Sequence, residues 1–266
     1  MLTNYHTHTS YCDGKNTPEE VVASAIERGF DAIGFSGHVR VEGSCYGTDD
    51  ITGYIAEVTR LKQKYGSKIQ IYLGMEEDSM GLVNRGDFDY IIGSSHFFTV
   101  NGELYPIDSN AQCFEKCLEV FGGDVIKLAD TYYRDFCSYI KARKPDIVGH
   151  FDLITKFDEL DAPKFFANPE YISLSEKYMH NALSNDVIFE VNTGAIFRGF
   201  RTNPYPHTNL LHIIKSCGGK VTLSSDSHSA DTLDFWFDEA RKMLKDIGFE
   251  YTYVLYDNEF KKDYLK

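Results

Sequence analysis

The 266-residue sequence lacks an excess of positive charge. Lysine and arginine total 27 against 40 aspartates and glutamates, so the formal net charge is −13. A surface of this sign repels nucleic-acid phosphates and anionic lipids at long range. We therefore expect no nucleic-acid partner and no membrane partner. An anionic substrate would need a local positive source, such as bound metal.

Long apolar runs and paired cysteines are missing as well. No run approaches the roughly 20 residues needed to cross a bilayer, which excludes a membrane-spanning helix. The first residues also lack the basic and apolar regions of a secretory signal. The cysteines form neither a CxxC pair nor a compact framework, so we expect free thiols and a cytoplasmic location. They are Cys12, Cys45, Cys113, Cys117, Cys137 and Cys217.

Short apolar runs do alternate with amphipathic stretches along the whole chain. This alternation is typical of repeated βα units around a parallel sheet. A chain of this length routinely forms one α/β barrel, so we expect a single domain over residues 1–266. The predicted strands are 2–5, 31–35, 69–74, 90–94, 146–149, 187–191 and 220–224.

The connections between these strands carry helix signals. In the first, Thr17 is an N-cap followed by Pro18 at the first helical position and Glu20 at the third, and Gly29 ends the helix. A long insert over 110–143, between the fourth and fifth strands, predicts two helices hinged at Gly122-Gly123; a lid and a subunit contact both remain open as its role. Further helices are expected at 50–65, 170–184, 208–217 and 231–246, a loop at 197–207 and a last strand at 251–256.

Potential metal ligands follow the predicted strands. Parallel strands of a barrel end at the same rim, where active sites lie. Packing gives no reason to gather histidines and carboxylates there, and burying them together without counter-ions is costly. Imidazole and carboxylate suit Zn, Fe or Mn, and each ion takes about four to six ligands, so the set implies two to three divalent ions. The candidates are His6, His8, Asp13, His38, Glu76, His96, His150, Asp226 and His228.

Six motifs carry a resemblance to a known family. In chain order they are HTHTSYCDG, GHV, GMEED, SSH, GHFD and SDSH. Together they resemble the polymerase and histidinol phosphatase (PHP) family, from His6 to His228. The closest likeness is to its stand-alone histidinol-phosphate phosphatase branch, which has this length, Asp at position 13 and a helical insert. The resemblance implies a distorted (β/α)7 barrel with a trinuclear metal site.

The resemblance also implies how the ligands divide. Glu76 would bridge the first two ions; the adjacent Glu77 and Asp78 are less secure, because GMEED offers three acidic groups and only the G-x-E position favours Glu76. The first ion would be held by His6, His8, Glu76 and Asp226, the second by Glu76, His96 and His150, and the third by Asp13, His38 and His228.

Such a site predicts phosphomonoester hydrolysis without a protein nucleophile, because a hydroxide that bridges two ions is ionised at neutral pH. The substrate implied by the resemblance is L-histidinol phosphate, giving L-histidinol and inorganic phosphate in histidine biosynthesis. Glu76, Asp226 and His228 are the expected catalytic residues. Either a metal ion or one of Asp226 and His228 would neutralise the leaving alkoxide.

The loop after the sixth strand supplies candidate phosphate-binding residues. Arg198 and Arg201 lie on this loop, with Arg40 behind them, and guanidinium groups bind phosphate oxygens in pairs. Phe97 fits either a pocket wall or the core. Lys156 is expected to be exposed.

Three other functions were weighed against this one. A relative acting on nucleotides or single-stranded DNA needs a basic or aromatic groove, and none is evident. A non-catalytic barrel would be expected to have lost ligands, whereas this chain keeps all nine. A metal-dependent amide or lactone hydrolase usually brings a carboxylated lysine, and no lysine stands at a strand exit.

Overall fold

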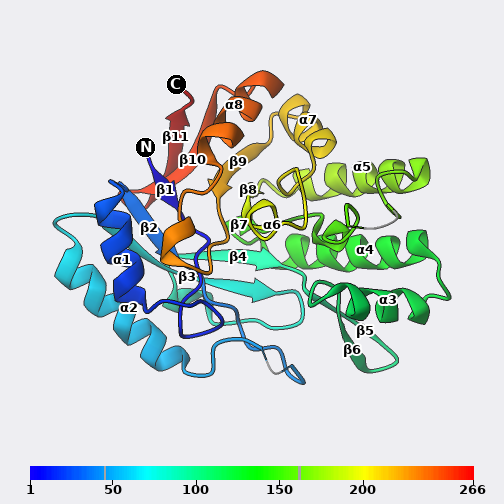
Figure 1. Cartoon of the computed structure of the whole chain (residues 1–266), viewed down its shortest axis with the longest axis horizontal. Coiled ribbons are helices and arrows are strands. Elements are labelled where there is room, and N and C mark those ends of the chain that lie inside the picture. The colour runs from blue at the N-terminus through cyan, green and yellow to red at the C-terminus, as the bar shows by residue number, and fades with distance from the viewer. Residues whose placement is uncertain (45, 161–162) are drawn as a thin grey trace.

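The computed structural model describes residues 1–44, 46–160 and 163–266. Its centre is a seven-stranded sheet in the order β1-β2-β3-β4-β7-β8-β9, in which every neighbouring pair is parallel (Figure 1). This confirms the predicted α/β class with parallel strands. The strands are β1 (Thr3–Asn4), β2 (Ala32–Phe35), β3 (Gln70–Asp78), β4 (Tyr90–Ser94), β7 (Ile147–Val148), β8 (Ile188–Asn192) and β9 (Lys220–Ser224).

The sheet curves round until its two edge strands meet. Beyond the ends of β1 and β9, Thr7 and Ser227 form a parallel bridge. The amide of His8 donates to the carbonyl of Ser227 at 2.8 Å, and the amide of Ser227 donates to the carbonyl of His6 at 3.0 Å. The result is the predicted barrel of seven strands, closed at the rim where their carboxyl ends lie.

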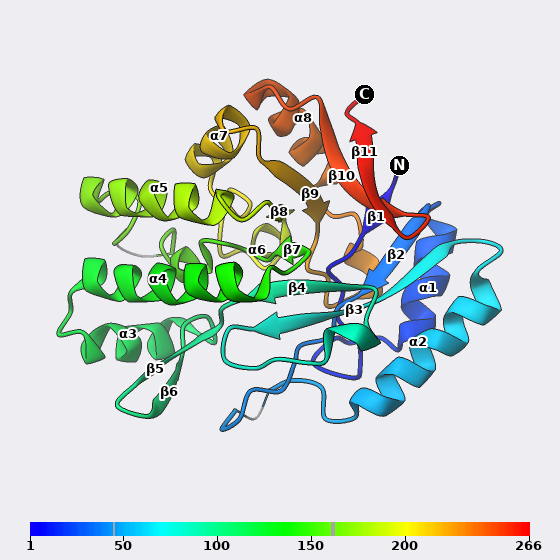
Figure 2. The ribbon, with the colours of Figure 1, turned by 180° about the vertical axis from the view of Figure 1, so that it is seen from behind.

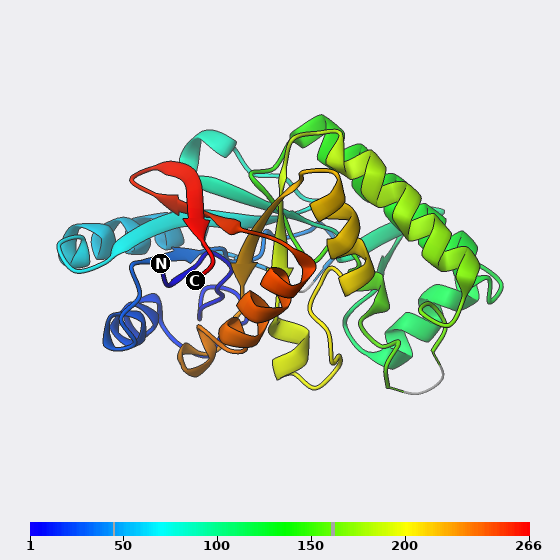
Figure 3. The same ribbon diagram turned by 90° about the horizontal axis from the view of Figure 1, so that it is seen from above.

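Helices form the outer layer of the barrel (Figures 1 and 3). The first is capped as predicted, because the Thr17 side chain accepts from the Glu20 amide while the Glu20 carboxylate accepts from the Thr17 amide. The helices between and after the strands are α1 (Pro18–Glu27), α2 (Ile51–Tyr65), α5 (Pro169–Leu183), α6 (Gly194–Phe197), α7 (Thr208–Ser216) and α8 (Phe237–Ile247).

The predicted insert lies between β4 and β7 and contains two helices, α3 (Ala111–Val120) and α4 (Val125–Arg143). Gly122 and Gly123 lie between the two helices, and both have positive φ. Asp124 caps α4, as expected. A short hairpin, β5 (Phe97–Val100) and β6 (Glu103–Pro106), precedes the helices and was not predicted. α4 lies beside α5 on the outside of the barrel (Figures 1 and 2).

A terminal hairpin covers the amino end of the barrel. It consists of the predicted strand β10 (Tyr251–Tyr256) and an additional one, β11 (Glu259–Tyr264). Val254 and Leu255 of β10 pack against tyrosines that fill the barrel interior, and the Tyr5 hydroxyl donates to the Leu255 carbonyl at 2.7 Å. The barrel is therefore filled at one end by aromatic side chains, which leaves the other end for chemistry.

Tyr90 occupies the middle of the barrel and explains two glycines of the neighbouring strands. A Cβ on Gly34 would lie 2.4 Å from the Tyr90 hydroxyl oxygen, and one on Gly74 would lie 2.3 Å from the ring. The hydroxyl donates to the carbonyls of Tyr5 and Phe35. Glycine at both positions makes room for the ring directly beneath the mouth of the barrel.

Some element boundaries differ from those expected. β3 runs to Asp78 rather than ending at residue 74, so Glu76 lies within the strand and not after it. α8 begins at Phe237, not at 231, because a 3₁₀ turn at Ala230–Thr232 precedes it. Cys45 lies outside the described residues, and the other five cysteines are unpaired. No helix in the described ranges is long and apolar enough to cross a membrane.

Candidate metal centre

The nine predicted ligands converge at the mouth of the barrel. They form four overlapping groups, within each of which the potential ligand atoms lie within 4.8 Å of one another. The segments that follow β1, β2, β4, β7 and β9 contribute eight of the nine, and β3 itself contributes Glu76. The groups are His8, Asp13, His38 and His228; His6, Glu76 and His150; His6, His8 and Asp226; and His38, Glu76 and His96.

Glu76 stands at the centre of this cluster. Its Oε2 lies 3.2 Å from His6 Nε2 and 2.7 Å from His38 Nδ1. Its Oε1 lies 2.9 Å from His150 Nε2 and 3.4 Å from His96 Nε2. A carboxylate with imidazoles against both oxygens has the arrangement required of a bridging ligand.

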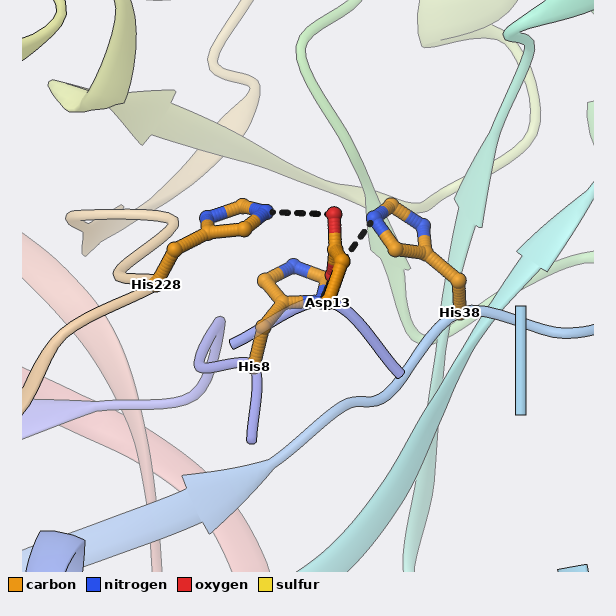
Figure 4. Close-up of side chains that lie close together, drawn as sticks. All are labelled: His8, Asp13, His38 and His228. Atoms are coloured by element: carbon orange, nitrogen blue, oxygen red, sulfur yellow. Dashed lines mark ion pairs between the residues drawn. The ribbon is translucent and has the colours of Figure 1, made fainter. Parts of the chain in front are cut away.

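Asp13 gathers the outer part of the cluster (Figure 4). Its carboxylate lies 3.2 Å from His228 Nε2 and 3.8 Å from His38 Nε2, the two pairs joined by dashed lines. His8 lies beneath, with Nδ1 3.7 Å from the same carboxylate. These four side chains come from three separate segments, after β1, β2 and β9.

Four buried atoms test whether this donor set fits metal ions. Although other polar atoms lie close to some of them, His6 Nε2, His8 Nε2, His150 Nδ1 and Glu76 Oε2 make no hydrogen bond within the described residues. Leaving such atoms unpaired in the interior costs about 1–3 kcal/mol each. Lone pairs of imidazole and carboxylate gathered in one cavity are the ligands that divalent ions of the Zn, Mn and Fe type take. The residues present fit such ions.

The charges of the cluster shift its pKa values in opposite directions. Burial raises the pKa of Glu76, but the surrounding imidazoles outweigh it and hold that pKa well below its usual range. Burial lowers the pKa of His6, yet Glu190, Glu76 and Asp226 outweigh it and raise the value. His8 behaves differently, because burial and the charges of His228 and His38 lower its pKa to about 3.

Two further carboxylates orient the histidines. Glu190 Oε2 lies 2.7 Å from His6 Nδ1, and its other oxygen accepts from the His150 amide at 2.8 Å. Asp78 Oδ2 accepts from the His96 amide at 2.7 Å and lies 3.2 Å from its Nδ1. Such partners fix the ring and raise its basicity. Glu190 lies within β8 and was not among the predicted site residues.

Asp226 has an unusual backbone conformation. Its φ is +47°, in the left-handed region that non-glycine residues rarely adopt. In this conformation Oδ1 lies 3.2 Å from His8 Nε2, while Oδ2 accepts from Arg198 at 2.9 Å. The turn after β9 thus brings one carboxylate to both the cluster and the predicted phosphate-binding arginine.

A pocket of about 610 Å³ opens above the cluster. Its floor includes six of the nine ligands and Arg198, and its walls include Phe97 and Phe200. Lys156 also lines it and is only 12% exposed, contrary to expectation, because its ammonium is bound by Asp108. Tyr46 was missed: its hydroxyl hydrogen-bonds His38 Nε2 from the loop before α2.

Two of the three predicted phosphate-binding arginines lie elsewhere. Arg201 is fully buried away from the pocket, with Nη1 donating to Thr155 at 2.8 Å and facing Asp152 at 3.5 Å. Arg40 pairs with Asp49 on an exposed loop and does not line the pocket. The partners of these two arginines lie away from the pocket: Thr155 and Asp152 hold Arg201 in the interior, and Asp49 holds Arg40 on its loop. Arg198 alone of the three reaches the pocket.

Comparisons with known proteins identify a family that this chain matches. The model of the PHP domain family matches residues 4–194. A Schizosaccharomyces pombe protein named "Probable histidinol-phosphatase" is 30% identical over 93% of this chain and 87% of its own. A Lactococcus lactis protein named "Histidinol-phosphatase" is 25% identical over 92% of this chain and 91% of its own.

One solved structure is similar over nearly the whole fold. It is the histidinol phosphate phosphatase of Lactococcus lactis, complexed with zinc, L-histidinol and phosphate. It superposes with a TM-score of 0.73 and 21% identity, over 98% of this chain and 99% of that chain. At this identity the likeness shows the shared barrel fold.

Proposed function

The chain belongs to the PHP domain family, and from this membership we propose that it hydrolyses L-histidinol phosphate to L-histidinol and inorganic phosphate. The observation that carries the proposal is the position of the pocket. It opens directly over nine converging metal-ligand side chains at the mouth of the barrel. Relatives named histidinol-phosphatase supply the identity of the substrate.

We assign the nine side chains to two or three divalent ions of the Zn, Mn or Fe type. Glu76 has imidazoles against both of its oxygens, which supports a bridging role. We assign Asp13 and His228 to the ion in the outer part of the cluster. We assign Asp226 to the ions nearer Glu76. His8 and His38 each belong to two of the four groups of potential ligands. The positions of the bound ions therefore decide which ion each of them binds.

When bound, such ions polarise phosphoryl oxygens and supply an ionised water at neutral pH. The chain contributes the groups around them. Arg198 lines the pocket and is held in place by Asp226, and we assign to the phosphate the N–H groups that Asp226 does not use. The buried side chains beneath exclude bulk water, which strengthens every charge interaction at the floor.

The leaving group of this reaction is an aliphatic alkoxide, which is poor because its conjugate acid holds its proton tightly. A proton or a positive charge must therefore reach the ester oxygen. Asp226 and His228 both line the pocket next to Arg198. Because both are assigned as metal ligands, neither would hold a proton to give, so the positive charge would come from a bound ion or from Arg198 beside them. Packing of Phe97 and Phe200 at the wall leaves an apolar surface for the imidazole ring of the substrate.

The proposal is tested by phosphate release from L-histidinol phosphate, from mononucleotides and from nitrophenyl phosphate. Each is measured with Mn or Zn added and again after chelation. We expect kcat/KM for histidinol phosphate to exceed the others by orders of magnitude and chelation to abolish release. Equal turnover of all the esters would leave the metal chemistry standing and refute the substrate; faster cleavage of nucleotides would favour a nucleotide phosphoesterase.

A further inference from the structure

The pocket wall carries a charged pair that the metal centre does not use. Outside the nine ligands, the charged residues that line the pocket are Arg198, Asp108 and Lys156. Arg198 is engaged with Asp226 at the floor. Asp108 and Lys156 face the pocket from the other side, where Phe97, Leu104, Pro106 and Phe200 make the surface apolar.

The position of Asp108 relative to the metal centre is fixed by its backbone. The preceding residue, Ile107, is fully buried and its amide donates to the carbonyl of His96 at 2.9 Å. His96 belongs to the cluster around Glu76. Asp108 therefore follows directly a residue that is hydrogen-bonded to the backbone of His96, on the short segment between β6 and α3.

The ammonium of Lys156 binds Asp108 rather than facing the open pocket. Its ammonium donates to the Asp108 carbonyl at 2.7 Å and lies 3.2 Å from the carboxylate Oδ2. It also lies 5.1 Å from the ring centroid of Phe200, a distance at which a cation is attracted to an aromatic face. With its donors directed at the wall, Lys156 is a positioning residue for the carboxylate.

The Asp108 carboxylate keeps capacity for a second cation. A carboxylate offers about four lone-pair sites, and Lys156 contacts Oδ2 alone. Burial raises the pKa of Asp108, but the charge of Lys156 outweighs it and lowers the value, so the group is ionised at neutral pH. It is 22% exposed on the pocket side. An anionic oxygen thus faces the space above the metal centre.

We propose that Asp108, positioned by Lys156, binds the ammonium group of the substrate and makes the site selective for phosphate esters of amino alcohols. The inference rests on the proposed function. In histidinol phosphate the ammonium stands on the carbon next to the ester-bearing carbon, so a phosphate at the floor places it beside the wall. Arg198 then holds the anionic end and Asp108 the cationic end.

The test compares L-histidinol phosphate with imidazolylpropyl phosphate, the same ester without the amine. Asp108→Asn keeps the shape and removes the charge. We expect it to lower kcat/KM for histidinol phosphate by about tenfold to hundredfold, mainly through KM, since hydrogen bonds between charged groups have this strength. The preference for the amine-bearing ester should shrink by the same factor. Asp135→Asn, an equal charge change on an exposed face of α4, should keep the preference intact.

Binding of the product gives a second measurement of ammonium recognition, and it does not depend on turnover of histidinol phosphate. L-histidinol and imidazolylpropanol are compared as competitive inhibitors of nitrophenyl phosphate hydrolysis. Asp108→Asn should weaken inhibition by L-histidinol and leave the two inhibitors nearly equal. If the variant keeps the wild-type ratio of inhibition constants, the proposal is overturned.

Lys156→Met distinguishes two roles for the lysine, positioning of Asp108 and binding of the phosphate. We expect it to reduce the preference for the amine, in the same direction as Asp108→Asn. A loss of equal size with both esters would mean that Lys156 binds the phosphate and would overturn its positioning role. Failure of the wild-type enzyme to prefer histidinol phosphate over nitrophenyl phosphate would instead refute the proposed function itself.

Discussion

Glu76 and Glu77 are neighbours on β3 and point to opposite faces of the sheet. Glu76 faces the barrel mouth among the imidazoles, whereas Glu77 faces outward and is bound by Arg143 and by the Tyr139 hydroxyl at 2.9 Å. Successive side chains of a strand alternate in this way. Two adjacent, fully buried glutamates thus have unrelated tasks, and the pair offers a matched experiment.

Glu76→Gln should lower metal content and reduce kcat/KM by more than about a hundredfold, because losing a bridging ligand exceeds the effect of losing an outer partner. Glu77→Gln should instead keep its metal and lower the free energy of unfolding by about 3–5 kcal/mol, the cost of breaking a buried ion pair. Elemental analysis and urea unfolding measure the two effects. Full metal content in Glu76→Gln would contradict the bridging role.

Glu190→Gln should weaken metal binding by about tenfold to hundredfold without removing a ligand. The carboxylate holds His6 Nδ1 at 2.7 Å, so neutralising it loosens the ring and lowers its basicity. Titration with Zn or Mn, monitored calorimetrically, measures the change. Glu239→Gln, an exposed position on α8 that belongs to none of the four ligand groups, is the control. Unchanged affinity would show that packing alone orients His6.

Metal binding should release protons near neutral pH. In the metal-free protein the pKa values of His6 and His96 are raised: burial lowers each, but neighbouring carboxylates outweigh it. Both rings are therefore protonated at pH values above the ordinary 6.5, and a metal ligand must be neutral. The number released should be largest below the raised pKa values and fall as pH rises through them. Calorimetry in buffers of different ionisation enthalpy counts the protons, and identical heats in all buffers would exclude their release.

Arg198→Lys should reduce kcat/KM for phosphate esters by about tenfold to hundredfold, because an ammonium cannot reproduce the paired donors of a guanidinium. The loss should be the same for histidinol phosphate and nitrophenyl phosphate, since both carry the phosphate. Arg40→Lys is the matched control and should behave as wild type, because Arg40 pairs with Asp49 outside the pocket. Equal effects of the two substitutions would remove Arg198 from the phosphate site.

The regular part of the fold was predictable because periodicity and capping act locally. The strands at 90–94 and 220–224 and the capping box at Thr17 lie where expected. The strand predicted at 69–74 was shorter than β3 because the last residues of β3 are acidic. An apolar pattern cannot reveal the part of a strand whose inner face lines a polar barrel mouth. The β5–β6 hairpin was not predicted for a related reason, since it is half exposed and only Phe97 and Phe98 of its strands are buried.

The candidate ligands were predictable because strand exits of a parallel barrel share one rim. Side chains whose direction depends on distant partners were not. Arg201 was expected beside the phosphate, but Asp152, 49 residues away in the chain, draws it into the interior. Lys156 was expected at the surface, and Asp108, 48 residues away, holds it at the pocket wall. Glu76 was favoured over Glu77 by its G-x-E position alone, and the physical reason, the binding of Glu77 by Arg143 on α4, came only with the structure.

The bridge that closes the barrel joins two segments that are synthesised at different times. Asn4 and Ser225, which meet beside that bridge through a side-chain hydrogen bond of 2.7 Å, are 221 residues apart. His6 and His8 are synthesised long before Asp226 and His228. The full ligand set therefore exists only after β9 and the turn that follows it have been translated. A chain that ends before β9 lacks Asp226 and His228 and cannot complete the metal centre.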